Sequence, residues 1–299
     1  MTGEQASISA PLDTAALRTA RHRLPRSIRL LLGDPLAVVS LLIILGCIVL
    51  AVFAPLIAPY PYQEQALRSR LEGPSLSHWM GTDDLGRDIF SRIIWGARVT
   101  VVVSFGAVAV GVTTATAIGL CAGYFRGVFD LVSQRCVDAI MAMPALIILL
   151  VVVSVAGRGL VTLILSLAII QSAFAIRIAR ATTLQVSQLQ FVEAARVVGC
   201  SDLRIIVRHV LPGLLAPMMV VTSIGMGVAI LAESSLSFLG YGVVPPTPSW
   251  GAMLSGSSRV YMISNPWMSL WPGLAIASVV FAFNMLGDAL RDVLDPRLR

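Results

Sequence analysis

Six long apolar runs constrain this chain more than any other feature of its sequence. A helix needs about 20 apolar residues to cross a hydrocarbon core of ~30 Å. Five runs contain no charged residue at all, and the six together cover residues 36–56, 99–124, 139–157, 159–176, 213–238 and 270–287. With 57% hydrophobic and only 13% charged residues, the composition excludes an ordinary soluble domain. We therefore predict an all-α membrane protein with six transmembrane helices.

Two of the predicted spans contain an irregular residue. Pro144 lies inside the third span, where it removes one backbone hydrogen bond and predicts a kink. Glu233 lies near one end of the fifth span, and an ionisable group there is costly unless it faces protein or water. Glu233 is therefore either a packed structural group or part of a transport path, and the sequence leaves both open.

The positive residues are all arginine, 22 in number, and the sequence contains no lysine. A Walker A phosphate loop needs a lysine on the β- and γ-phosphates, and Schiff-base chemistry needs a lysine amine. The chain is therefore predicted to be no enzyme, with no catalytic residue and no cofactor of its own. The four cysteines and three histidines are dispersed, so neither a disulfide framework nor a metal site is indicated.

The arginine distribution predicts the orientation in the membrane. Fifteen arginines fall before residue 36, between spans two and three, between spans four and five, and after span six, whereas seven fall on the opposite side. Cytoplasmic loops carry the excess of positive charge, so both termini are expected in the cytoplasm. The membrane topology thereby explains the excess of positive over negative residues, and no nucleic-acid partner is predicted.

The segment between spans four and five predicts two short amphipathic helices. Apolar residues recur at helical spacing in two sets, separated by Gly199: Phe191, Ala194, Ala195 and Val198, then Leu203, Ile206, Val207 and Val210. Gly199 suits a left-handed position after a helix, and Ser201 with Asp202 suits the start of the next one. Such a corner either docks in a partner's groove or lies on lipid headgroups, and periodicity alone does not choose.

A resemblance favours docking. Glu193-Ala194-Ala195, Gly199 and Leu211-Pro212 resemble the Glu-Ala-Ala signature of the membrane subunits of ATP-binding-cassette (ABC) importers, with His209 in place of the usual Ile. The resemblance implies the type I ABC importer permease fold, in which this loop forms cytoplasmic coupling helices that dock on the ATPase. It assigns ATPase coupling to Glu193, Ala194, Ala195, Arg196, Gly199, Asp202, Leu211 and Pro212.

Three further stretches resemble the dipeptide/oligopeptide branch of that family: residues 80–98, 233–251 and 284–297. Their roles stay open between local structure and substrate contact. The family-motif residues are Gly81, Thr82, Asp83, Gly86, Arg87, Asp88, Glu233, Trp250, Asn284, Asp288 and Asp295, and Pro144 of the third span is grouped with them.

The resemblance implies a permease subunit of an ATP-driven importer for di- or oligopeptides in a bacterial inner membrane. Its partners would be a homologous permease chain, two ATPase subunits that hold ATP and Mg²⁺, an extracytoplasmic binding protein, the peptide substrate and membrane lipid. Permeases for nickel, glutathione or oligosaccharide are the alternatives within the family, and an ion-coupled secondary transporter is a distant one. We expect an Arg-rich cytoplasmic tail (1–35), the first span with its loop (36–97), and a five-helix core (98–299) that contains the coupling loop 177–212.

Overall fold

The structure, a computed structural model, describes residue 31 and residues 33–294. Most of the predicted Arg-rich tail and Asp295 lie outside the described residues. Within them the chain is helical, and an isolated bridge between Thr82 and Asp88 is the β interaction found there. The elements are α3 (Pro35–Val52), α4 (Ala54–Ile57), η1 (Leu67–Ser69), α5 (Ile89–Phe125), α6 (Gly127–Met141), α7 (Ala145–Ala156), α8 (Leu160–Val186), α9 (Gln190–Val197), α10 (Asp202–Ile205), η2 (Ile206–Val210), α11 (Leu211–Phe238), α12 (Trp250–Met253), α13 (Ser257–Val260) and α14 (Trp267–Leu294).

Five described helices are long and apolar enough to cross a membrane, namely α3, α5, α8, the continuous stretch Asp202–Phe238, and α14. A sixth crossing exists if α6 and α7 are counted as one broken span. The predicted all-α membrane fold is confirmed. Several helices run past the predicted apolar limits, because α5 begins at Ile89 and α8 continues to Val186.

The third span is not the single kinked helix that the sequence predicts. The sequence predicted one kinked helix over residues 139–157, whereas α6 ends at Met141, α7 begins at Ala145, and the two meet at 92°. Pro144 occupies the position before the first turn of α7. Because proline disfavours helical backbone in the residue before it, Pro144 ends one helix and starts another.

The helix α3 illustrates how the first span begins. The Asp34 carboxylate accepts a hydrogen bond from the Leu36 backbone nitrogen at 2.9 Å, and Pro35 occupies the first turn. Both are favourable at a helix start. The helix packs on α5 and α14 and leaves much of its leucine-rich surface exposed, as a lipid-facing helix would.

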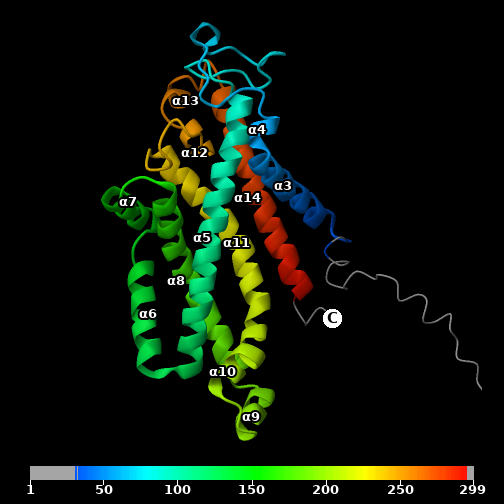
Figure 1. The fold of residues 1–299 in the computed structure, drawn as a ribbon, viewed down its shortest axis with the longest axis vertical. Coiled ribbons are helices and arrows are strands. Elements are labelled where there is room, and N and C mark those ends of the chain that lie inside the picture. Colours follow the sequence, from blue (N-terminus) through cyan, green and yellow to red (C-terminus); the bar gives the residue numbers. More distant parts are fainter. Residues whose placement is uncertain (1–30, 32, 295–299) are drawn as a thin grey trace, which may run out of the picture.

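The most extensive helix–helix packing in the described bundle is between α5 and α8, which run side by side (Figure 1). Gly119 and Gly123 of α5 permit this approach: an added Cβ would lie 2.5 Å from Ala179 Cβ and 2.6 Å from Thr183 Cβ, respectively. Small residues four apart let helix backbones meet closely in membranes. The spacing was present in the sequence but entered none of the predictions.

The bundle has two differently built ends, seen at top and bottom of Figure 1. One end carries α9 and is here called the α9 end. The other carries α12, α13 and the loops over residues 58–88 and 239–266, here called the cap. The first turn of α3 and the last turn of α14 both lie away from the cap, so the described chain enters and leaves on the same side.

Candidate functional site

The corner segment, residues 187–212, forms the turn between α8 and α11 at the α9 end. Gly199 has φ +81°, and the Cys200 backbone nitrogen donates to the Ala195 carbonyl at 3.1 Å. This is the left-handed helix end that the sequence predicts at Gly199. Ser201, in extended conformation, precedes α10, and Asp202 is its first residue. Pro212 lies in the first turn of α11, where proline is tolerated.

The corner segment exposes apolar side chains on its outer surface. Val197, Val198 and Leu203 are 84%, 82% and 72% exposed, and Phe191 is also exposed. Val192 and Ile205 are fully buried and hold the segment to the bundle. The apolar set predicted for the second helix is divided, because Leu203 and Val207 are exposed while Ile206 and Val210 are buried. Exposed apolar residues grouped at a helical corner mark an interaction surface.

A hydrogen bond ties the corner segment to the end of α5. The Tyr124 hydroxyl donates to Asp202 Oδ1 at 2.6 Å, and the Arg196 guanidinium lies over the Tyr124 ring, 5.3 Å from its centre. Tyr124 thereby contacts both α9 and α10. The sequence selected Arg196 and Asp202 but missed Tyr124, which lies 78 residues before Asp202.

A cleft of about 740 Å³ opens beside this contact. Its lining combines both charges with polar and apolar groups: Tyr124, Arg126, Ser187, Gln188, Glu193, Arg196 and Val197. The structure therefore brings Glu193 and Arg196 together on one wall of a hollow. Ala194 lies on the exposed side of α9 and Ala195 is half-buried. Because both side chains are small, no bulky group covers the backbone of α9 at these two positions.

Ion pairs hold α6 to α8 near the same end. The Asp130 carboxylate accepts two hydrogen bonds from the Arg180 guanidinium, one of them 2.6 Å long. Arg177 Nη2 donates to Asp138 Oδ1, also at 2.6 Å. Two-pronged arginine–carboxylate pairs fix geometry as well as charge. The sequence treated both arginines only as topology signals, because their partners lie on another helix.

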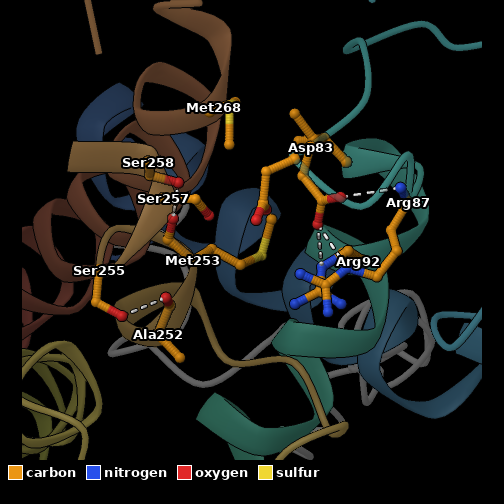
Figure 2. A pocket seen from close by; sticks show the side chains of 11 residues that line it. Asp83, Arg87, Arg92, Ala252, Met253, Ser255, Ser257, Ser258 and Met268 are labelled. Carbon is orange, nitrogen blue, oxygen red and sulfur yellow. Dashed lines mark hydrogen bonds and ion pairs between the residues drawn. The ribbon is translucent and has the colours of Figure 1, made fainter. Parts of the chain in front are cut away.

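The motif residues 81–88 lie in the cap and are joined by hydrogen bonds within their own loop. Asp83 Oδ1 accepts from the backbone nitrogens of Leu85 and Arg87 at 2.9 Å each, while Oδ2 accepts from Arg87 Nε at 2.6 Å. Arg92 lies 3.7 Å from the same carboxylate. Figure 2 shows this cluster on one wall of a cavity of about 50 Å³, opposite residues of α12 and α13. The Asp83 carboxylate thus holds the loop over residues 83–87 in shape.

The neighbouring motif residues complete the turn into α5. Asp88 Oδ2 accepts from the Ser91 backbone nitrogen at 2.7 Å, and His78 Nδ1 lies 2.9 Å from Asp88 Oδ1. The Thr82 hydroxyl accepts from the Glu72 backbone nitrogen at 2.9 Å. Gly81 and Gly86 both have positive φ, 79° and 71°. The 80–98 stretch is thus the folded start of α5.

Trp250 and Glu233 lie where α11 meets α12. Trp250 is buried, and its indole nitrogen donates a hydrogen bond to the Ile93 carbonyl of α5. Glu233 is completely buried, and Ser237 Oγ donates to its Oε1 at 2.6 Å. No described residue hydrogen-bonds Glu233 Oε2. The Glu233 carboxylate faces protein, one of the two placements that make it tolerable in a span.

The remaining motif residues lie apart from both sites. Asn284 Nδ2 donates to the Val280 carbonyl at 3.0 Å within α14, and Asp288 is exposed near the end of that helix. Among the described residues, no cluster of three or more His, Cys, Asp or Glu side chains has the arrangement of a metal site.

The structure is thus a helical membrane bundle with a structured cap at one end and an exposed apolar corner at the other. The chain belongs to the family of binding-protein-dependent transport system inner membrane components, which matches residues 115–299. The N-terminal transmembrane domain of oligopeptide transport permease C matches residues 26–74.

Individual relatives are similar over nearly the whole chain. The dipeptide transport system permease protein DppC of Alkalihalophilus pseudofirmus is 41% identical over 266 residues, 89% of this chain and 87% of the relative. The glutathione transport system permease protein GsiD of Escherichia coli is 41% identical over 284 residues, 95% of this chain and 92% of that protein. GsiD of Pectobacterium atrosepticum is 40% identical over 272 residues, 91% and 90% of the two chains.

Proposed function

We propose that this chain is a permease subunit of an ATP-driven importer that takes up di- or oligopeptides delivered by a binding protein. The observation that carries the proposal is the corner segment, a folded docking surface at the end of a bundle whose chain is 41% identical to a dipeptide permease. Glutathione is the second candidate substrate, because the glutathione permeases are equally similar.

ATP hydrolysis is assigned to partner subunits. The chain has no lysine for a Walker A loop, so ATP and Mg²⁺ would bind to the ATPase chains. Their docking site would be α9 with its exposed apolar residues and the adjacent cleft, where Glu193 and Arg196 offer charges to a partner. For ATP to shift the transporter between states, contacts at this surface must differ between those states.

The proposed topology places the α9 end in the cytoplasm and the cap outside. The arginine excess and the common side of the first and last described helices support it. The cap presents exposed apolar residues, among them Leu76 (99% exposed) and Trp79, which suit a binding protein that docks from outside. A homologous permease chain would complete the membrane pathway.

Single-cysteine labelling tests the topology. In a variant whose four native cysteines are replaced by alanine, Leu76→Cys should react with a membrane-impermeant maleimide in intact cells. Val197→Cys, also highly exposed in the chain (84%), should react only after the membrane is opened. The reverse pattern would invert the topology and remove the corner segment from the ATPase side. Protease-accessible tags on the two termini provide an independent check.

Uptake of labelled peptides tests the function. Cells that lack the gene and cells complemented with it are compared for di- to pentapeptides, with glutathione and nickel as parallel substrates. Peptide uptake that is lost and restored supports the proposal. Loss of glutathione or nickel uptake alone keeps the permease but changes its substrate, and uptake that persists after ATP depletion contradicts an ATP-driven importer.

A further inference from the structure

The contact between Tyr124 and the corner segment joins three elements at one side chain. The Tyr124 hydroxyl donates to Asp202 Oδ1 at the start of α10, and the Tyr124 ring lies under Arg196 near the end of α9. Tyr124 itself is the second-last residue of α5. Both helices of the corner segment are therefore attached to the same long helix.

Helix α9 has few other attachments. Val192 is buried and Ala195 is half-buried, whereas the other side chains of α9 are exposed. A helix of eight residues is stabilised mainly by its contacts rather than by its own hydrogen bonds, whereas α10 continues through η2 into α11. The link at Tyr124 consequently fixes the direction in which α9 projects from the bundle.

The α5 side of the contact is rigid. Gly123, next to Tyr124, packs so closely on α8 that an added Cβ would lie 2.6 Å from Thr183 Cβ. Tyr124 therefore stands on the tightest helix pair of the bundle, and a displacement of α9 or α10 acts directly on that pair.

We infer that Tyr124 is a positioning residue that transmits movement of the corner segment to α5, through a hydrogen bond to Asp202 and a cation–π contact with Arg196. The inference rests on the proposed function and deepens it, because it names the side chain that links the ATPase docking surface to the membrane bundle. Neither the Glu-Ala-Ala signature nor the periodicity of the segment pointed to this residue.

The test uses the complete transporter, with its partner permease, ATPase subunits and binding protein, in proteoliposomes. Tyr124→Phe removes the hydroxyl and keeps the ring. Loss of one such hydrogen bond, worth about 1 kcal/mol, should lower peptide taken up per ATP hydrolysed about fivefold while ATP hydrolysis continues. Tyr60→Phe is the matched control, since it removes a hydroxyl that donates to the Ser77 carbonyl in the cap.

Two further measurements separate transmission from simple folding. Asp202→Ala should cause a similar loss, and the double variant should lose no more than the worse single variant, because both remove one link. Hydrogen exchange in the complex should rise over residues 190–205 in Tyr124→Phe and stay unchanged in the control. Unchanged exchange, additive losses, or raised exchange with normal uptake per ATP would each overturn the inference.

The same design keeps the two proposals apart. A wild-type complex that takes up no peptide contradicts the proposed function, whatever the variants do. In that case hydrogen exchange over residues 190–205 still decides whether Tyr124 holds the corner segment. Equal exchange in Tyr124→Phe and in the wild type would overturn the inference on its own.

Discussion

The indole nitrogen of Trp250 donates a hydrogen bond to the main-chain carbonyl of Ile93, 2.9 Å away, and so attaches α12 to α5. The two residues are 157 positions apart and both are buried. The bond connects the cap to the same helix whose other end carries Tyr124. Helix α5 therefore contacts the cap at its start and the corner segment at its end.

Replacing Trp250 tests this attachment. Trp250→Phe keeps a buried aromatic ring but loses the donor, so we expect a stability loss of about 1 kcal/mol. Trp250→Ala also leaves a cavity and should cost about 3–5 kcal/mol. Thermal unfolding of the detergent-solubilised protein measures both. Equal melting temperatures for the phenylalanine and wild-type proteins would mean that the bond contributes nothing.

Substitution of Gly199 should be limited by the backbone conformation at this position rather than by steric contact with neighbouring atoms. An added Cβ would meet no atom within 4 Å, but φ is +81°. Left-handed backbone costs a residue with a side chain about 1–2 kcal/mol, and a β-branched residue is the least suited. Gly199→Val should therefore uncouple ATP hydrolysis from uptake while the chain stays in the membrane.

Gly199→Asn is the control, since asparagine tolerates this conformation. It should retain most of the uptake that Gly199→Val loses, measured per ATP hydrolysed in the same membranes. Equal losses in both variants would show that something other than backbone conformation matters at this position.

The α5–α8 contact should fail when Gly119 or Gly123 is enlarged. Gly119→Val adds a side chain where Ala179 Cβ and backbone atoms of Ile176 and Arg180 lie, and overpacking of this kind typically costs about 1–3 kcal/mol. Gly46→Val, in α3, meets open space and serves as control. Fluorescence-detected size-exclusion chromatography after heating should show earlier aggregation for Gly119→Val only.

The Asp130–Arg180 pair predicts rescue by charge exchange. Asp130→Arg alone and Arg180→Asp alone each place like charges together and should reduce both stability and uptake. The double exchange restores opposite charges at the same positions and should recover part of the loss. Asp138→Asn, which weakens the separate pair with Arg177, is not expected to interact with either change.

In the cap, Gly86 occupies a position that no other residue fits. Its φ is +71°, and an added Cβ would lie 1.9 Å from the Ala66 carbonyl oxygen. Gly86→Ala should therefore displace the loop over residues 58–70 and increase its cleavage by protease. Gly73→Ala, where the nearest atom is 3.7 Å away in the Trp267 ring, should leave cleavage unchanged.

The sequence predicts the parts of this fold that depend on local pattern. Apolar runs identify the spans, and Gly199 with Ser201 and Asp202 identifies the break between α9 and α10. Pro144 signalled an irregularity but not its size, since the 92° turn depends on what α7 packs against. Proline restricts the local backbone without fixing the direction of the next helix.

The corner segment shows why helical spacing alone does not separate buried from exposed apolar residues. Leu203 and Val207 point away from the bundle although they match the helical spacing of core residues. A segment that faces the bundle on one side and a partner on the other carries apolar residues on both, so spacing does not tell them apart. Tyr124 and Arg180 were beyond sequence reasoning for another reason, because each finds its partner on a distant helix.

The close packing of α5 on α8 has a mechanical consequence. Two helices whose backbones touch through glycine resist bending and turn as a single rod, while the chain at either side of the pair, at Gly127 and Gly157, has the positive φ of a tight turn. Helix α5 has 37 residues and is about 55 Å long, so each degree of rotation about one end displaces the other by roughly 1 Å. The pair is therefore long enough that a tilt of a few degrees about one end would displace the other end by several ångströms.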